Sequence, residues 1–185
     1  MPYIKVIEEE DAGTELKETY NRVKGARGKL SNILKIHSLL PKTIETHLNL
    51  YMSIMFDKSG IKRADRELIA VIVSAANDCD YCVNHHAEAL LNYWKDDIKV
   101  AQAGKDFRKL DLSTKQIAML EFAEKLTISP GKMAESDIKK LRNSGFNDEE
   151  ILSISLVTNY FNFVNRNANA LGVEFSEEEV KGYKY

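Results

Sequence analysis

Two stretches of the chain are nearly the same, and this internal repeat limits the folds that the chain can adopt. "VNHHAEAL" begins at Val83 and "VNRNANAL" begins at Val164, and five of their eight positions are identical. Each stretch follows an apolar run that opens after a glutamate, Glu67 in the first copy and Glu150 in the second. These glutamates lie sixteen and fourteen residues before the matching valines. We interpret the pattern as one helix-pair unit used twice.

Helix signals dominate the rest of the chain. Apolar residues recur at helical spacing after Pro41, and Ser113 with Gln116 and Asn147 with Glu150 have the form of capping boxes. The runs "LIAVIVSAA" and "ILSISLV" could also be buried strands. Each follows an acidic segment typical of a helix first turn, and no strand-like partner occurs elsewhere. We therefore expect an all-α fold.

The length of 185 residues suits one domain, which we place over 1–185. Within it we expect a helical core over about 41–173. The cysteine-bearing repeat should span 63–93 and the cysteine-free repeat 147–173.

Composition excludes several classes of function. The net charge of -2 and the pI near 6.1 give no electrostatic basis for binding nucleic acid. The longest apolar run, Leu68 to Ala76, is too short to span a bilayer, and the N-terminus turns acidic where a signal peptide would be apolar. We expect a cytoplasmic protein with no nucleic-acid or membrane partner. In that compartment two cysteines three residues apart favour metal or redox chemistry over a structural disulfide.

The segment "DCDYCVNHH" holds both cysteines. Asn77 and Asp78 are favourable N-cap residues, which predicts a helix that begins at about Cys79. Cys79 and Cys82 would then lie side by side in the first turn, where the helix N-terminus lowers a thiol pKa. His86 follows Cys82 by one turn on the same face and can accept its proton.

A low-pKa thiol, a neighbouring base and a resolving thiol are the three parts of a peroxide-reducing cysteine site. The thiolate attacks the O–O bond to give a sulfenic acid, and the second cysteine condenses with it to a disulfide. His85 points about a quarter-turn away from His86 and is the weaker candidate.

Three other interpretations compete with this one. Zinc could use Cys79, Cys82, His85 and His86, but four ligands within eight residues of one helix cannot surround a tetrahedral ion. Covalent haem requires histidine directly after the second cysteine, where Val83 stands. The cysteines could also be small buried hydrophobic residues beside surface histidines. We expect neither a metal nor a cofactor.

The spacing of Glu67, Cys79, Cys82 and His86 resembles the alkylhydroperoxidase D motif of the carboxymuconolactone decarboxylase superfamily. The C-terminal stretch "NYFNFVNRNANALGV" resembles the peroxidase-related subgroup of that superfamily. The resemblance covers most of 41–173. It implies a helical fold with a repeated helical unit, and homo-oligomers, commonly trimers or hexamers, with sites near subunit contacts.

The resemblance also implies roles for the matching residues. Cys82 corresponds to the peroxidatic cysteine and Cys79 to the resolving one, while Glu67 and His86 correspond to the proton relay. The electron donor would be a thiol or dithiol, such as a lipoyl or thioredoxin-like protein. Members that decarboxylate muconolactones lack the cysteine pair, so its presence favours redox chemistry.

One position departs from the family pattern. Alkylhydroperoxidase D has a histidine between its cysteines, and this chain has Tyr81. A phenol with a pKa near 10 can donate a hydrogen bond to peroxide but is a poor base. Tyr81 and His85 are therefore accessory candidates.

Three hypotheses follow for the function. The first is a thiol-dependent peroxidase that reduces hydrogen peroxide or organic hydroperoxides through Cys82 and Cys79. The second is a lactone decarboxylase or isomerase in which the cysteines are incidental. The third is a non-enzymatic oligomeric redox sensor.

Two further features lie outside the motif. We interpret His47 as a packing or surface residue. The asparagine-rich run between Asn159 and Asn169 either cross-links helices at an interface or lines a pocket through Asn162 and Arg166.

Overall fold

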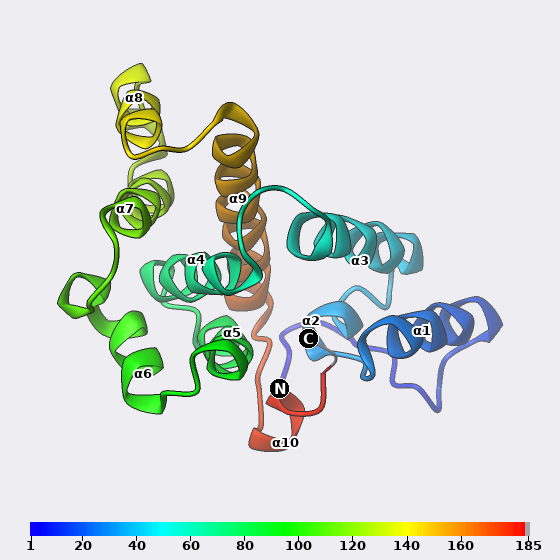
Figure 1. Ribbon diagram of the computed structural model, residues 1–185. Helices are drawn as coiled ribbons and strands as arrows, with labels where there is room; N and C mark the ends of the chain where they lie inside the picture. Colours follow the sequence, from blue (N-terminus) through cyan, green and yellow to red (C-terminus); the bar gives the residue numbers. More distant parts are fainter. Residues whose placement is uncertain (184–185) are drawn as a thin grey trace.

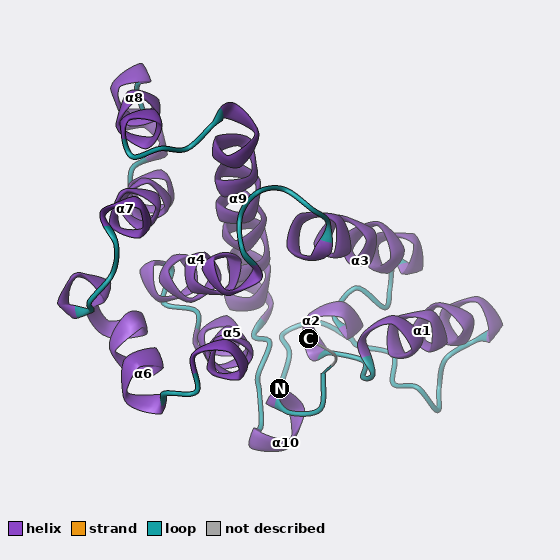
Figure 2. Cartoon of the chain, in the orientation of Figure 1, coloured by secondary structure: helices purple, strands orange, loops and turns teal. Residues whose placement is uncertain are grey.

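The computed structural model describes residues 1–183, and within them every regular element is a helix (Figures 1 and 2). The elements in chain order are α1 (Thr14–Arg27), α2 (Asn32–Lys35), α3 (Pro41–Phe56), α4 (Arg63–Ala76), α5 (Asp80–Trp94), α6 (Asp97–Asp106), η1 (Phe107–Lys109), α7 (Thr114–Ile128), η2 (Pro130–Lys132), α8 (Glu135–Asn143), α9 (Asp148–Leu171) and α10 (Glu177–Val180). The all-α prediction is confirmed.

The expected capping boxes are both present. Ser113 Oγ accepts a hydrogen bond from the Gln116 amide at the start of α7. The Asn147 side chain accepts from the Glu150 amide at 2.9 Å at the start of α9. Each box satisfies backbone N–H groups that a helix start would otherwise leave unpaired, which explains why these two helices begin there.

The apolar run in α4 is helical and central. Residues 68–73 are all buried because α4 packs against α5, α7 and α9 on different sides. Figure 1 shows α4 crossing the long helix α9, with α5 beside both. A helix that is apolar all round belongs in such a position.

The repeated segments differ in structure, so the helix-pair prediction is wrong for the second copy. Residues 63–93 form the pair α4 and α5, which is interrupted where Asp78 takes a left-handed backbone conformation with φ of 50°. Residues 147–173 contain one continuous helix, α9, which ends only where Gly172 adopts φ of 64°. Asparagine and aspartate tolerate the left-handed region, and the second copy has no such turn where the first one breaks.

Two hydrophobic clusters build the interior. The larger one surrounds α4 and α9, and the smaller one joins α1, α2 and α3 through Leu16, Tyr20, Leu34 and Leu48. The N-terminal helices meet the rest of the chain through α3, which packs against α4 and α9.

The beginning and the end of the described chain lie close together (Figure 1). The Tyr3 amide donates to the Leu171 carbonyl at 2.9 Å, and the Asn32 side chain donates to the Glu174 carbonyl at 3.0 Å. None of the helices in residues 1–183 is both long enough and apolar enough to cross a membrane.

Candidate active site

Both cysteines lie at the start of α5. Cys79 is the N-cap residue and Cys82 lies in the first turn, so the helix begins one residue later than the sequence predicts. The reason is the backbone of Asp78, whose positive φ prevents it from acting as the cap. Both thiols are free, and both are buried.

The two thiols form a coupled pair. The hydrogen bond from Cys82 is the largest influence that lowers the pKa of Cys79. The same hydrogen bond, followed by burial, raises the pKa of Cys82 well above its usual range. When one sulfur has lost its proton, the remaining proton lies between the two sulfurs. The first thiol therefore ionises more easily and the second with more difficulty, so the two pKa shifts describe the pair and not either cysteine alone. By themselves they favour the thiolate on Cys79, whereas the family resemblance gives the attack to Cys82.

The two cysteines differ in their access to a cavity in the protein. Cys82 lines the cavity described below, and Cys79 is not among the lining residues. A peroxide can reach a sulfur only through such an opening, so the shape of the site favours Cys82 as the attacking atom and Cys79 as its partner.

The predicted relay residues Glu67 and His86 are in direct contact. His86 Nδ1 lies 2.6 Å from Glu67 Oε2. The other oxygen of Glu67 accepts from Arg63, one turn earlier on α4, whose Nε donates at 2.8 Å. Burial opposes ionisation of Glu67, but His86 and Arg63 outweigh it and lower the pKa of this carboxyl.

The relay histidine is held neutral with one nitrogen available. Burial lowers the pKa of His86 even though Glu67 acts in the opposite direction, since Arg63 already compensates the carboxylate. A neutral imidazole that donates from Nδ1 to Glu67 has an unprotonated Nε2. His86 lines the same cavity as Cys82.

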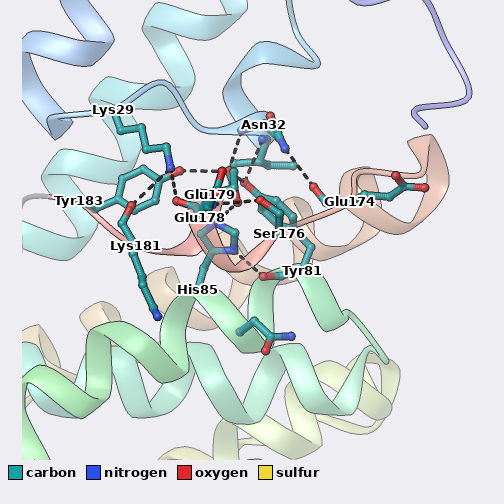
Figure 3. Close-up of polar contacts among 12 residues, drawn as sticks. Lys29, Asn32, Tyr81, His85, Glu174, Ser176, Glu178, Glu179, Lys181 and Tyr183 are labelled. Atoms are coloured by element: carbon teal, nitrogen blue, oxygen red, sulfur yellow. Dashed lines mark hydrogen bonds and ion pairs between the residues drawn. The ribbon is translucent and has the colours of Figure 1, made fainter.

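The accessory candidates face a different carboxylate, as Figure 3 shows. Tyr81 donates its hydroxyl hydrogen to Glu179 Oε1 at 2.9 Å, and His85 Nε2 lies 2.5 Å from Glu179 Oε2. His85 Nδ1 also donates to the Tyr81 carbonyl at 2.7 Å, so a further proton must lie between His85 and Glu179. The hydroxyl of Tyr81 is therefore engaged by Glu179 and is not directed at a peroxide.

Glu179 attaches the C-terminal segment, residues 174–183, to the cysteine helix. Its Oε1 also accepts from the Asn32 amide at 3.0 Å and from the Tyr183 hydroxyl at 3.0 Å (Figure 3). Lys29 binds the backbone carbonyls of Glu178 and Lys181. Burial opposes ionisation of Glu179, but its hydrogen bonds, led by the one from His85, lower its pKa.

A cavity of about 80 Å³ is lined by Tyr81, Cys82, His85 and His86 of the cysteine helix. It lies where the two hydrophobic clusters meet, because Leu34 and Leu48 of the smaller cluster face Cys82 and Phe161 of the larger one. Its remaining lining residues include His47, Tyr51, Tyr160 and Tyr183. The first forty residues carry none of the sequence motif and nevertheless contribute Arg27 and Ser31 to this wall.

Histidine, cysteine, aspartate and glutamate side chains form no group of three or more that could hold a metal ion anywhere in residues 1–183. The two histidines of the motif point to separate carboxylates, His86 to Glu67 and His85 to Glu179.

Comparison with known proteins relates the chain to one family and one fold. Residues 41–105 match the carboxymuconolactone decarboxylase family, and this span includes both cysteines and the Glu67–His86 pair. An alkylhydroperoxidase core structure from Ralstonia eutropha JMP134, described as an uncharacterized peroxidase-related protein, has 28% identity and a TM-score of 0.86 over 97% of this chain and 94% of its own. The chain is an alkylhydroperoxidase D-like protein.

Two further relatives of the alkylhydroperoxidase D-like chain extend the comparison. An uncharacterized peroxidase-related protein from Silicibacter sp. TM1040 has 28% identity and a TM-score of 0.84, over 96% of this chain and 94% of the other. The uncharacterized protein YdfG of Bacillus subtilis (strain 168) is 28% identical over 131 residues, which cover 65% of this chain and 86% of YdfG.

Asn165 is a site residue of the alkylhydroperoxidase D-like chain that the sequence did not single out. It is fully buried, donates to Ser74 Oγ at 3.0 Å and accepts from Asn77 at 3.0 Å. Its amide also lowers the pKa of both Cys79 and Cys82. The asparagine-rich run was the available signal, and within it the amides of Asn162 and Asn165 bind Thr127 of α7 and Ser74 of α4.

Proposed function

We propose that this alkylhydroperoxidase D-like protein is a thiol-dependent peroxidase that reduces hydrogen peroxide or compact organic hydroperoxides through Cys82 and Cys79. The observation that carries the proposal is the Glu67–His86 pair, whose histidine lines the same cavity as Cys82. Paired thiols alone would suit a structural role, but a neutral, oriented imidazole beside one of them supplies the base that peroxide reduction needs.

The first step transfers one oxygen atom. His86 Nε2 takes the thiol proton of Cys82, and the thiolate attacks the terminal oxygen of the hydroperoxide. An S–O bond forms and the O–O bond breaks, which leaves a sulfenic acid on Cys82. The leaving alkoxide or hydroxide takes the proton from His86 and departs as an alcohol or water.

The second step closes the disulfide. The thiol of Cys79 displaces the hydroxyl of the sulfenic acid, so one water molecule leaves and Cys79 and Cys82 are joined. A dithiol donor, such as a lipoyl or thioredoxin-like protein, then reduces the disulfide and is itself oxidised. This cycle needs a reducing compartment such as the cytoplasm. We also propose that the chain forms a homo-oligomer, a trimer or a hexamer, as the family suggests.

The size of the cavity favours small substrates. A cavity of about 150 Å³ holds benzene, and the cavity beside Cys82 measures about 80 Å³. Hydrogen peroxide is small enough for this space, whereas a larger hydroperoxide requires some of the lining side chains to move.

Two cysteine variants test the proposal. Peroxide consumption is measured with a dithiol reductant in excess for the parent chain and Cys82→Ser, whereas Cys79→Ser is given a pulse of peroxide without reductant. We expect no turnover from Cys82→Ser, and one sulfenic acid per subunit without continued turnover from Cys79→Ser. Full turnover by Cys82→Ser would contradict the proposal.

A further inference from the structure

A row of hydrogen-bonded side chains runs from the cavity wall toward the surface. The Tyr160 hydroxyl lies 2.8 Å from His47 Nε2, and His47 Nδ1 lies 3.3 Å from His37 Nε2. His37 Nδ1 lies 3.0 Å from Thr43 Oγ1, which in turn lies 2.7 Å from the Leu40 carbonyl oxygen. The row links α9 to α3 across 113 residues of sequence.

The direction of every hydrogen bond in this row follows from its outer end. A carbonyl oxygen only accepts, so the single hydroxyl hydrogen of Thr43 goes to Leu40. Thr43 must then accept from His37 Nδ1. A neutral His37 protonated at Nδ1 has an unprotonated Nε2.

The same reasoning continues inward. The unprotonated Nε2 of His37 accepts from His47 Nδ1, which leaves Nε2 of His47 as an acceptor. His47 Nε2 therefore receives the hydroxyl hydrogen of Tyr160. The tyrosine has no second hydrogen, so its oxygen offers only lone pairs to the cavity.

The ionisation states agree with this assignment. Burial, helped by His37, lowers the pKa of His47 to about 4, and burial also lowers the pKa of His37. Burial raises the pKa of Tyr160 well above its usual range, and the neighbouring Tyr51 and Cys82 act in the same direction. At neutral pH both histidines are uncharged and the tyrosine keeps its hydrogen.

We propose that Tyr160 orients the substrate in the cavity by accepting the O–H hydrogen of a hydroperoxide, and that His47 and His37 are positioning residues that keep its oxygen an acceptor. The inference rests on the proposed peroxidase function and adds a contact for the substrate. It is based on the hydrogen-bond row and on the shared cavity, which Tyr160 and Cys82 line from different helices.

This contact leaves the oxygen balance of the reaction unchanged. The hydrogen that Tyr160 accepts stays on the terminal oxygen of the hydroperoxide and becomes the hydrogen of the sulfenic acid. Cys82 attacks that oxygen, and the proton that His86 holds goes to the leaving oxygen. A ligand without an O–H or N–H donor gains nothing from Tyr160.

The test compares two reagents in the Cys79→Ser background, where Cys82 is the only thiol. Hydrogen peroxide has the O–H that Tyr160 would accept, whereas methyl methanethiosulfonate is attacked by thiolates but has no O–H or N–H hydrogen to donate. We expect Tyr160→Phe to slow the reaction with peroxide about tenfold, the effect of one hydrogen bond, and to leave the reaction with methanethiosulfonate unchanged.

The matched control is Tyr20→Phe. Tyr20 is also a buried tyrosine, but its hydroxyl donates to the Ile7 carbonyl at 2.7 Å in the smaller hydrophobic cluster. This variant should leave both rates unchanged. Equal rates with peroxide for Tyr160→Phe and its parent, or an equal loss with both reagents, would overturn the inference.

Two variants of His47 test the positioning role. His47→Leu removes the acceptor for Tyr160 and should slow the peroxide reaction selectively. His47→Gln can accept from Tyr160 through its amide oxygen and donate to His37 through its amide nitrogen, so it should restore most of the rate. Identical peroxide rates for the two variants would contradict the positioning role.

The failure of this inference can be told apart from the failure of the peroxidase proposal. If the parent chain does not react with hydrogen peroxide, the proposed function is wrong and the inference falls with it. If the parent reacts and Tyr160→Phe reacts equally fast, only the role of Tyr160 is wrong.

Discussion

His86 Nδ1 lies 2.6 Å from Oε2 of the fully buried Glu67. The carboxylate is compensated on its other oxygen by Arg63, so the histidine beside it stays neutral and keeps Nε2 as a base. A pair of this kind orients a base without charging it, which is what proton transfer from a neighbouring thiol requires.

We predict that Glu67→Gln slows oxidation of Cys82 by hydrogen peroxide on the order of a hundredfold, the usual effect of a misplaced acid–base group. It also leaves Arg63 buried without a counter-charge, which should lower the free energy of unfolding by about 3 kcal/mol. Single-turnover kinetics and urea denaturation measure the two effects.

The matched control for this prediction is Glu150→Gln. Glu150 begins the apolar run of the second repeat, where it caps α9, a role that glutamine also performs. The peroxide rate should not change. If Glu67→Gln oxidised as fast as this control, the Glu67–His86 pair would have no part in the chemistry.

We predict that Glu179→Gln loosens residues 174–183. The ionised carboxylate holds Tyr81 and His85 of the cysteine helix, and hydrogen bonds to charged groups contribute about 1.5–3 kcal/mol each. Amide hydrogen exchange of the segment, and alkylation of Cys82, should both become about tenfold faster. Glu178→Gln is the control, because its exposed side chain is next in sequence and only its backbone binds Lys29.

The attachment of this segment should depend on pH. The pKa of Glu179 is lowered in the folded chain, so its contribution to stability is present above the unfolded pKa of 4.5. It is lost as the pH falls below 4.5 and through the folded pKa. The protection of residues 174–183 against hydrogen exchange, taken relative to the intrinsic exchange rate at each pH, should therefore fall more steeply on acidification in the parent chain than in Glu179→Gln, and parallel profiles would contradict this account.

We predict that Asn165→Ala raises the pH at which the first thiol of the cysteine pair ionises. The amide of Asn165 lowers the pKa of both Cys79 and Cys82, and its removal also takes away the donor to Ser74 Oγ and one of the acceptors of the Asn77 amide. The loss of stability should be about 1–3 kcal/mol. Thiolate absorbance against pH and thermal unfolding measure these changes.

Asn159→Ala is the control for Asn165, since the exposed Asn159 lies on the same helix and its amide binds only Ser155. This variant should leave the pH at which the first thiol ionises unchanged. An unchanged titration in Asn165→Ala as well would show that the amide does not influence the sulfurs.

We predict that His47 reduces stability at mildly acidic pH. Its pKa falls from 6.5 to about 4 on folding, so the unfolded chain binds a proton that the folded chain does not. Stability should decrease as the pH falls from 6.5 to about 4, by about 3 kcal/mol at roughly 1.4 kcal/mol for each pH unit. Urea denaturation at a series of pH values should show a smaller decrease in His47→Gln. Equal slopes would contradict the pKa assigned to His47.

Local signals in the sequence predicted the local structure well. The capping boxes at Ser113 and Asn147 mark the starts of α7 and α9, because a cap depends only on residues within one turn. Glu67 and His86, which the family pattern relates to a proton relay, are in contact in the structure. The start of α5 was misplaced by one residue, since the left-handed backbone of Asp78 arises from the packing of α4 against α5.

Contacts between distant segments were not predictable in the same way. Glu179 is ninety-eight residues from Tyr81, and its helix α10 has only four residues, so no periodic pattern marks it. The sequence led us to interpret His47 as a packing or surface residue. Its partner in the structure, Tyr160, lies far away in sequence and reaches it only because α3 packs against α9. The part of the cavity wall that His47 and Tyr160 form therefore depends on tertiary packing and not on local propensity.

The central claim is that Cys82 and Cys79 form a centre that reacts with peroxide. The most direct test is the intact mass of the reduced chain after a near-stoichiometric pulse of hydrogen peroxide, with the remaining thiols alkylated. We expect both thiols to disappear within seconds into a disulfide. If both thiols remain available for alkylation, the chain has the alkylhydroperoxidase D-like fold without its peroxide chemistry.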